Sequence, residues 1–461
     1  MANNINDNDI RDLSKFDSEI FDNISELIES QEKESVLTLF AGLHSADISE
    51  IINHLNLEDA IYAFKLLSPE IAGEVITELD DNLRENILAQ IEPQKIVDIV
   101  DNLDTDDATD IVSELPESIA EVVLGKIDKE YSEDVKELLK YPEDTAGGIM
   151  NSDFVFIYDD AVVADAIEEV RKNAEEIDHI YYIYVLDQDN KLAGIVAIKS
   201  LLINPLNTKV EKIMERDLIY VTPDVDQEEA ARIIEKYDLI TLPVVDENRV
   251  MLGRITFDDV VDVIHEEASE DLQRVAGLSE DEEFSDSPFK ISRNRLPWLL
   301  VSLFGELVSA VVLSSFELSI KQIVVASFFI PIVMAMGGSS GTQAAIVMVR
   351  SIFESEYWIS DSSRRIFKEF RVALINATAC GIILLFGSHY FFNTEFAFSL
   401  ILTSSLFVIM INATMIGAVI PIILKRVGVD PAIATGPFVN TMNDILGLLI
   451  YLTLITLFLV R

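Results

Sequence analysis

Five long apolar stretches in the last third of this 461-residue chain constrain its fold more than any other feature. They cover residues 297–316, 322–349, 370–392, 396–424 and 432–460. At about 1.5 Å of rise per helical residue, each can cross roughly 30 Å of hydrocarbon. Inside a bilayer every backbone polar group must be paired within the protein, so these segments are expected to be α-helices. We therefore expect a five-helix all-α transmembrane domain over residues 291–461.

The basic residues around these stretches gather on one side of the expected membrane. The other side has only Lys321 and the terminal Arg461. The positive-inside rule then predicts a multi-pass protein of the cell (plasma) membrane, with its N-terminal part in the cytoplasm and its C-terminus outside. The basic residues of the cytoplasmic side are Lys290, Arg293, Arg295, Arg350, Arg364, Arg365, Lys368, Arg371, Lys425 and Arg426.

Charge separates this part of the chain from the rest. Residues 295–461 hold 9 acidic and 10 basic residues, which leaves 71 acidic and 24 basic residues in 1–294, a net charge of −47. Such a surface repels polynucleotides and attracts cations, so no nucleic-acid partner is expected. Solubility or adaptation to salt is the simpler explanation of the same charge. The single cysteine, Cys380, excludes an intrachain disulfide.

A 12-residue repeat organises the region before residue 140. A Leu or Ile recurs at this interval nine times from Leu43 to Leu139, and each interval contains apolar residues at helical spacing. Each unit predicts one short helix, and such helices become stable by stacking on their neighbours. We expect a polar N-terminal segment over 1–34 and an α-helical repeat superhelix with acid-rich outer faces over 35–140.

The pattern then changes to two similar α+β units. The first has β-like runs at 154–157, 180–185 and 192–198 around a helix at 163–173, and the second has runs at 218–221, 241–245 and 251–255 around a helix at 227–237. Two such β-α-β-β-α units commonly pack as one pseudo-symmetric body. The expected bounds are 141–205 and 206–264, followed by a connecting helix and acidic linker over 265–290.

The sequence offers no sign of an enzyme, because it contains no nucleophile elbow, P-loop, glycine-rich dinucleotide turn or His/Cys metal spacing. Polar residues inside the apolar stretches are more informative, since they are costly unless they face a partner or a polar pathway. Asp444 lies in the last stretch, with Asn440 one helical turn earlier on the same face. Together they suit an oxygen-ligated hard cation. The alternative is a protonated Asp444 that is hydrogen-bonded to a neighbouring helix.

Two further features of the apolar stretches leave alternatives open. Glu306 in the first stretch could line a vestibule or make a structural hydrogen bond. The second stretch contains Gly337, Gly338 and Gly341 followed by Gln343. Glycines at membrane depth indicate close helix packing or a water-filled cavity, and the added amide favours a pore.

At these residues the chain resembles the MgtE family of magnesium channels. The resemblance covers almost the whole length, and its most specific segments are Pro142–Met150, Arg295–Leu300, Gly337–Gln343 and Pro421–Gly447. It implies that the paired α+β units are CBS domains between the helical repeats and the transmembrane domain. It also implies a homodimer in a lipid bilayer, with a pore between the subunits. The family usually has Asn where this chain has Ser339, which leaves the exact ion selectivity open.

The resemblance also implies site residues. Asp444, with Asn440 beside it, would bind the transported Mg²⁺ in the pore, largely through its water shell. Regulatory Mg²⁺ would bind acids of the cytoplasmic part and hold them together against their mutual repulsion, with the linker helix relaying closure to the pore. These acids are Asp226, Glu228, Asp238, Asp259, Asp262, Glu267 and Glu270.

CBS pairs often bind adenine nucleotides at a motif with a hydroxyl and an Asp. Gly253, Thr256 and Asp259 fit this motif, whereas the first unit has Ser200 in place of the Asp. At most one site, for ATP, is therefore expected. The leading hypothesis is a magnesium channel or transporter closed by cytosolic Mg²⁺. The rivals are a transporter of another cation, Co²⁺ or Na⁺, on the same scaffold and a membrane sensor that does not conduct.

Overall fold

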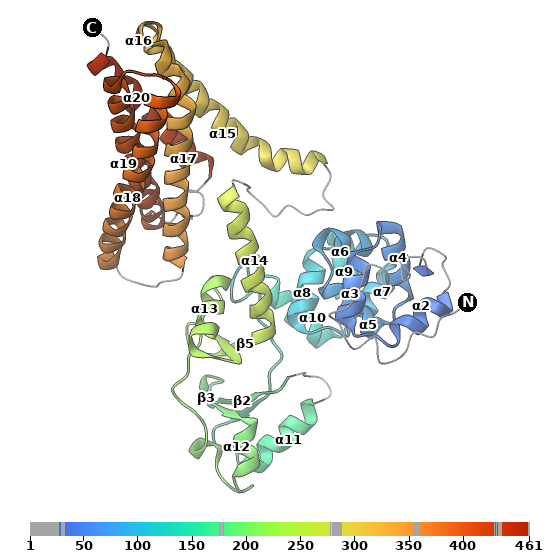
Figure 1. Cartoon of the computed structure of the whole chain (residues 1–461). Coiled ribbons are helices and arrows are strands. Elements are labelled where there is room, and N and C mark those ends of the chain that lie inside the picture. The colour runs from blue at the N-terminus through green and yellow to red at the C-terminus, as the bar shows by residue number, and fades with distance from the viewer. Residues whose placement is uncertain are drawn as a thin grey trace. The chain divides into compact units, whose positions relative to one another are not determined.

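The computed structural model describes residues 27–28, 33–174, 177, 179–276, 278, 288–353, 359–427, 429, 431 and 436–459 (Figure 1). The chain forms two compact units, Met1–Glu266 and Glu267–Arg461. Most of the predicted N-terminal segment, the acidic run 279–287 and Arg461 lie outside the described residues.

The first unit begins with short helices that follow the 12-residue repeat. Eight successive helices each begin 12 residues after the one before, which confirms one helix per repeat. They are α3 (Ser45–Asn53), α4 (Leu57–Leu66), α5 (Pro69–Thr77), α6 (Asp81–Leu88), α7 (Pro93–Val100), α8 (Thr105–Ser113), α9 (Glu117–Leu124) and α10 (Lys129–Leu138), preceded by α2 (Lys33–Phe40). Alternate helices pack on one another, as in the series α3, α5, α7 and α9, so the stack has two rows.

The repeated residue holds this stack together. Leu67, Leu79, Ile91, Leu115 and Ile127 are buried, and the other Leu residues of the series pack against the same core. Helices of two or three turns are marginal by themselves, so this shared core is what stabilises them.

Two α+β halves follow, and the helix that closes the second half continues beyond Glu266, where the first unit ends. The first contains β1 (Phe156–Tyr158), α11 (Val163–Asn173), β2 (Tyr182–Leu186), β3 (Leu192–Ala197) and α12 (Ile198–Ile203). The second contains the 3₁₀ turn Val210–Lys212, α13 (Gln227–Tyr237), β4 (Thr241–Val245), β5 (Met251–Thr256) and α14 (Phe257–Ala276). β1 is parallel to β2, whereas β2 with β3 and β4 with β5 are antiparallel hairpins.

The predicted strand at 218–221 is wrong as a full strand. Only one parallel bridge forms there, between Val221 and Val244. No full strand forms because the segment pairs with both halves. Glu215 bridges to Ile195 in the first half, and Val221 bridges to Val244 in the second. In return, Asn151 before the first half bridges to Arg254 in the second. These exchanged segments join the halves into one body, as expected.

The connecting helix differs from its predicted start. Instead of beginning at 265, α14 runs without a break from Phe257 to Ala276. Its residues 257–276 contain no Gly or Pro, so nothing in the sequence interrupts the helix that closes the second half.

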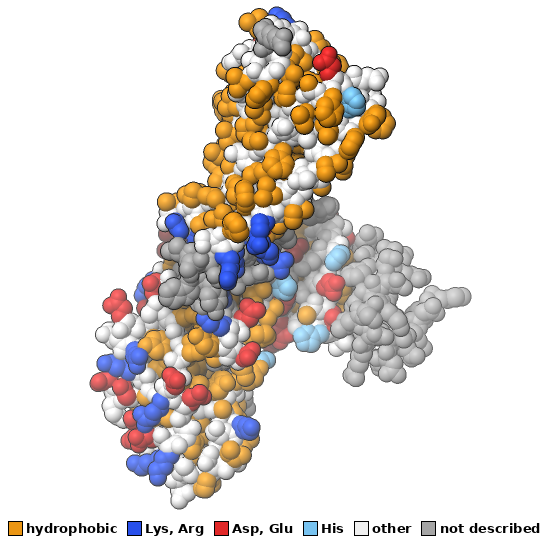
Figure 2. All heavy atoms as spheres, turned by 60° about the vertical axis from the view of Figure 1, so that its left-hand side comes forward, with side chains coloured by type: hydrophobic (Ala, Val, Ile, Leu, Met, Phe, Trp, Pro, Cys, Tyr) orange, Lys and Arg blue, Asp and Glu red, His pale blue; other side chains and the backbone are white. Residues whose placement is uncertain are grey.

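The second unit is a bundle whose hydrophobic side chains cover much of the surface visible in Figure 2. Five of its helices are long and apolar enough to cross a membrane. They are α15 (Pro288–Ser315), α17 (Val324–Phe353), α18 (Ile359–Phe391), α19 (Phe396–Arg426) and α20 (Pro437–Leu459). The short helix α16 (Glu317–Gln322), which the sequence did not predict, connects the first two. α19 packs against α17, α18 and α20, while α15 packs mainly on α20.

Glycines allow the central helices to approach closely. A Cβ on Gly417 of α19 would lie 2.1 Å from the carbonyl oxygen of Gly341 on α17, and a Cβ on Gly341 would lie 2.0 Å from Nδ2 of Asn443 on α20. Only a residue without a side chain fits at such distances. Close packing therefore explains Gly341 and Gly417, whereas Gly338 lies on a cavity.

Candidate ion pathway and regulatory acids

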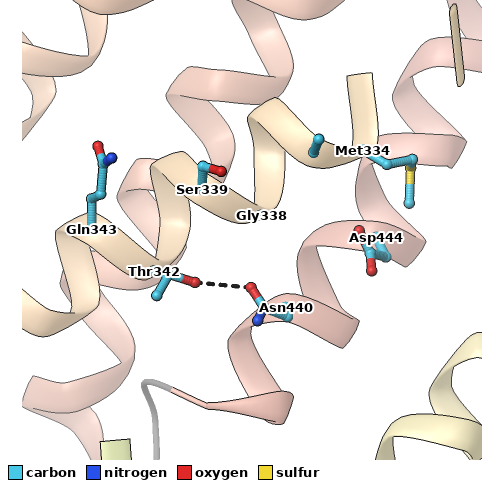
Figure 3. Close-up of a pocket in the computed structure, with 8 residues that line it drawn as sticks. Met334, Gly338, Ser339, Thr342, Gln343, Asn440 and Asp444 are labelled. Carbon is cyan, nitrogen blue, oxygen red and sulfur yellow. Dashed lines mark hydrogen bonds between the residues drawn. The ribbon is translucent and has the colours of Figure 1, made fainter. Parts of the chain in front are cut away.

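A cavity of about 580 Å³ lies between α17 and α20 of the membrane unit. It unites Asn440 and Asp444 with the glycine-containing segment of α17, which the sequence had singled out separately. Figure 3 shows Thr342 pointing toward Asn440, and Ser339 and Gln343 projecting from the other side of the α17 ribbon. The lining residues are Met334, Ala335, Gly338, Ser339, Thr342, Gln343, Asn440 and Asp444.

A hydrogen bond across the cavity positions the amide. The Thr342 hydroxyl Oγ1 donates to Oδ1 of Asn440 at 2.9 Å. Asp444 follows Asn440 by one turn of α20 and is half-buried, so its carboxylate faces the same cavity. The sequence could not find Thr342, because it is one of several hydroxyl residues in its helix and only the fold brings it to α20.

Glu306 supplies a second carboxyl group beside this cavity. It extends from α15, and its carboxyl group lies close enough to that of Asp444 for the two groups to interact electrostatically. Both alternatives for Glu306, a lining of the pathway and a structural hydrogen bond, are compatible with this position beside Asp444. Two carboxyl groups, an amide and hydroxyl groups form an oxygen-rich set typical of hard cations. Across the described ranges no three His, Cys, Asp or Glu residues gather into a ready metal cage.

The cytoplasmic acids predicted on α13 do not converge within one chain. The Asp226 carboxylate caps the helix by accepting from the backbone N–H of Glu228 at 2.9 Å. Asp238 lies at the other end as its C-cap, with φ 50°. At 1.5 Å per residue, these two ends are roughly 18 Å apart, so no single ion can bind both.

The residues of the predicted nucleotide motif lie where β5 ends and α14 begins. The Thr256 hydroxyl donates to Oδ2 of Asp259, which also accepts from the Thr256 backbone N–H at 3.2 Å. Burial raises the pKa of Asp259 to about 6, although the bonds from Thr256 oppose that shift. Burial also raises the pKa of Asp262, one turn later on α14. Both carboxyl groups would be easier to keep ionised with a cation nearby.

Two acids of α8, Asp106 and Asp107, interact electrostatically with Asp259. The general expectation of acid-rich outer faces does not extend to Asp106, which is only 9% exposed and accepts from Nδ2 of Asn151 at 3.2 Å. Burial, followed by repulsion from Asp259, raises the pKa of Asp106 well above its usual range and that of Asp107 to about 7. Burial raises the pKa of Asp153 to about 6. Nothing in the repeat distinguishes α8, because its burial comes from packing on the α+β pair.

The linker acids lie further along α14. Glu267 and Glu270 are separated by one helical turn, and Glu270 forms an ion pair with Arg274. The side chain of Asp271 lies outside the described residues.

Three family models and several known proteins are similar to this chain. A family model described as a divalent cation transporter, MgtE, matches residues 330–454, one for the MgtE intracellular N domain matches 43–144, and the CBS domain model matches 146–206 and 210–266. The chain is 34% identical to the magnesium transporter MgtE of Bacillus subtilis (strain 168), over 89% of this chain and 94% of that protein. It is 31% identical to the MgtE of Enterococcus faecalis (strain ATCC 700802 / V583), over 94% and 96%.

A solved structure matches about half of the chain. It is the cytosolic domain of the Mg²⁺ channel MgtE in complex with ATP, with a TM-score of 0.50, 28% identity, and coverage of 53% of this chain and 99% of that one. The five apolar helices and the family models together define a multi-pass membrane transporter with a cytosolic N-terminal region built from helical repeats and a CBS pair. The chain belongs to the MgtE family of magnesium transporters.

Proposed function

We propose that this chain forms a homodimeric Mg²⁺ channel of the plasma membrane whose pore passes the cavity between α17 and α20. The observation that carries the proposal is the convergence of Asp444, Asn440 and Thr342 from two membrane helices, with Glu306 beside them. Mg²⁺ prefers oxygen ligands and gives up its water reluctantly. Six water molecules occupy roughly 180 Å³, at about 30 Å³ each. The 580 Å³ cavity therefore has room for the hydrated ion.

The homodimer is supported by the helix that begins the bundle. Only 6% of the apolar window of α15 is buried within one chain, although this helix carries Glu306. A second copy that covered this face would enclose the cavity and remove it from lipid. In the proposed membrane topology the first unit lies in the cytoplasm and the C-terminus lies outside.

Regulation by cytosolic Mg²⁺ forms the second part of the proposal. The first 294 residues carry a charge of −47, so their domains repel one another unless cations bind between them. Asp226, Glu228 and Asp238 lie on α13 and the remaining four acids on α14, where ions can bridge them to other elements or to a second subunit. ATP would bind at Thr256 and Asp259, as the ATP complex of a relative supports. Ion bridges in the compact state would close the pore.

The test is Mg²⁺ flux into liposomes that contain the purified chain. Asp444→Ala should abolish flux while the protein remains folded, because it removes the carboxylate that lines the cavity. Glu317→Ala is the control, since Glu317 lies outside the cavity and forms an exposed ion pair with Lys321 that contributes little. Normal flux in Asp444→Ala would rule out the pore assignment. Equal flux of Co²⁺ or Na⁺ would favour another cargo, and no flux of any cation would favour a sensor.

A further inference from the structure

A second pocket, of about 360 Å³, lies in the CBS pair and is unrelated to the acids described above. Its floor is apolar, with Val245 1% and Leu192 8% exposed, and Leu218 and Tyr220 complete it. Leu192 comes from the first half and the others from the second. A ligand in this pocket would therefore touch both halves.

Arg249 on the rim adopts a backbone conformation that Arg seldom takes. Its φ is 67°, in the left-handed region. The matching turn of the first half has the same shape, with Asn190 at φ 60°. In each turn an Asp, Asp187 or Asp246, accepts from the backbone N–H groups two and four residues later. Asn adopts this conformation more readily than Arg, so the turn itself gives no reason for an Arg at this position.

The guanidinium of Arg249 is held in place by an aromatic ring. It lies over the ring of Tyr220, 5.0 Å from its centroid. Within the described residues no carboxylate lies within 4.0 Å of it, although the first 294 residues contain 71 acids. A cation held in place without a counter-ion is available to an anion from outside.

Arg216 supplies a second cation on the same pocket. It pairs with Glu211 at 3.1 Å, but the two side chains are 60% and 57% exposed. Such exposed pairs contribute little and exchange easily for a better anion. Asp217 is the acid that lines the pocket, and it would weaken anion binding.

We propose that this pocket binds a small phosphorylated organic molecule, whose phosphate interacts with Arg249 and Arg216 and whose apolar body covers Leu192, Leu218 and Val245. Two guanidinium groups match the two charges and several oxygens of a phosphate monoester. The ligand would hold the two CBS halves together.

This site is separate from the nucleotide motif. Arg249 precedes β5 and Thr256 ends it, so the strand separates them by roughly 20 Å, at about 3.3 Å per residue. In the first half, Leu192 is likewise at the start of β3 rather than at its end.

The test is a titration of the full-length protein in detergent with phenyl phosphate, followed by ligand-observed NMR without divalent cations. Phenol and inorganic phosphate are the comparison ligands. The native chain should bind phenyl phosphate with a Kd of about 1 mM or tighter. Arg249→Asn, which leaves the turn with the residue found in the first half, should weaken binding about tenfold, as should Arg216→Gln. Asp217→Asn should tighten it.

The matched control is Arg171→Asn, which removes an exposed Arg from α11 outside the pocket and should change nothing. Binding that is unsaturated at about 10 mM, or equal in the native chain and Arg249→Asn, would overturn the proposal. If inorganic phosphate bound as tightly as phenyl phosphate, the apolar body of the ligand would contribute nothing, and the proposal of an organic ligand would be wrong.

Discussion

The acids Asp106, Asp107 and Asp259 should make the first unit less stable as the pH rises toward neutral. Burial raises the pKa of Asp107 from 3.8 to about 7. An acid whose pKa is raised by folding stabilises the protein fully below its unfolded pKa, and this stability is lost as the pH rises through the folded value. The loss per pH unit approaches about 1.4 kcal/mol between those two values. With partial ionisation of Asp107 near pH 7 taken into account, the free energy of unfolding should fall by about 2 kcal/mol between pH 5 and pH 7.

Asp107→Asn should remove this loss. The assay is urea unfolding, without divalent cations, of a soluble fragment that ends at Ala276, since a relative's cytosolic domain has been crystallised separately. The free energy of unfolding of the native sequence should fall from pH 5 to pH 7 by about 2 kcal/mol more than that of the variant. A constant effect of the new amide cancels in this comparison. Asp160→Asn, in an exposed turn, is the control. Parallel curves for Asp107→Asn and the native sequence would refute the burial argument.

Three other predictions follow from the described contacts and charges. Gly417→Ala should destabilise the membrane bundle by about 1–3 kcal/mol, because its methyl group would overlap the Gly341 carbonyl oxygen; thermal unfolding in detergent measures this, and an unchanged midpoint contradicts it. Glu267→Gln with Glu270→Gln should weaken the dependence of current on cytosolic Mg²⁺ in patch recordings, whereas an unchanged inhibition curve would exclude these two acids of α14 from the regulation by Mg²⁺. Mg²⁺ should compact the soluble segment 1–278 in small-angle scattering, and equal compaction by KCl at matched ionic strength would indicate general screening.

The sequence predicted the elements whose pattern is local. The 12-residue period of the Leu and Ile residues from Leu43 to Leu139 specified one helix per repeat, because each repeat has its own apolar residues at helical spacing. The apolar stretches specified five membrane helices, because hydrocarbon accepts no other form of so long a segment. The face shared by Asn440 and Asp444 also followed from helical spacing alone.

Contacts between distant segments needed the tertiary structure. The approach of Thr342 to Asn440 and of Glu306 to Asp444 depends on how α15, α17 and α20 pack, and a spacing rule carries no information about that. For the same reason Asp106 looked like one more solvated acid of the repeat. Charge and helical period are properties of the chain, whereas burial is decided by the surface that packs against it, and burial is what sets the protonation of these acids.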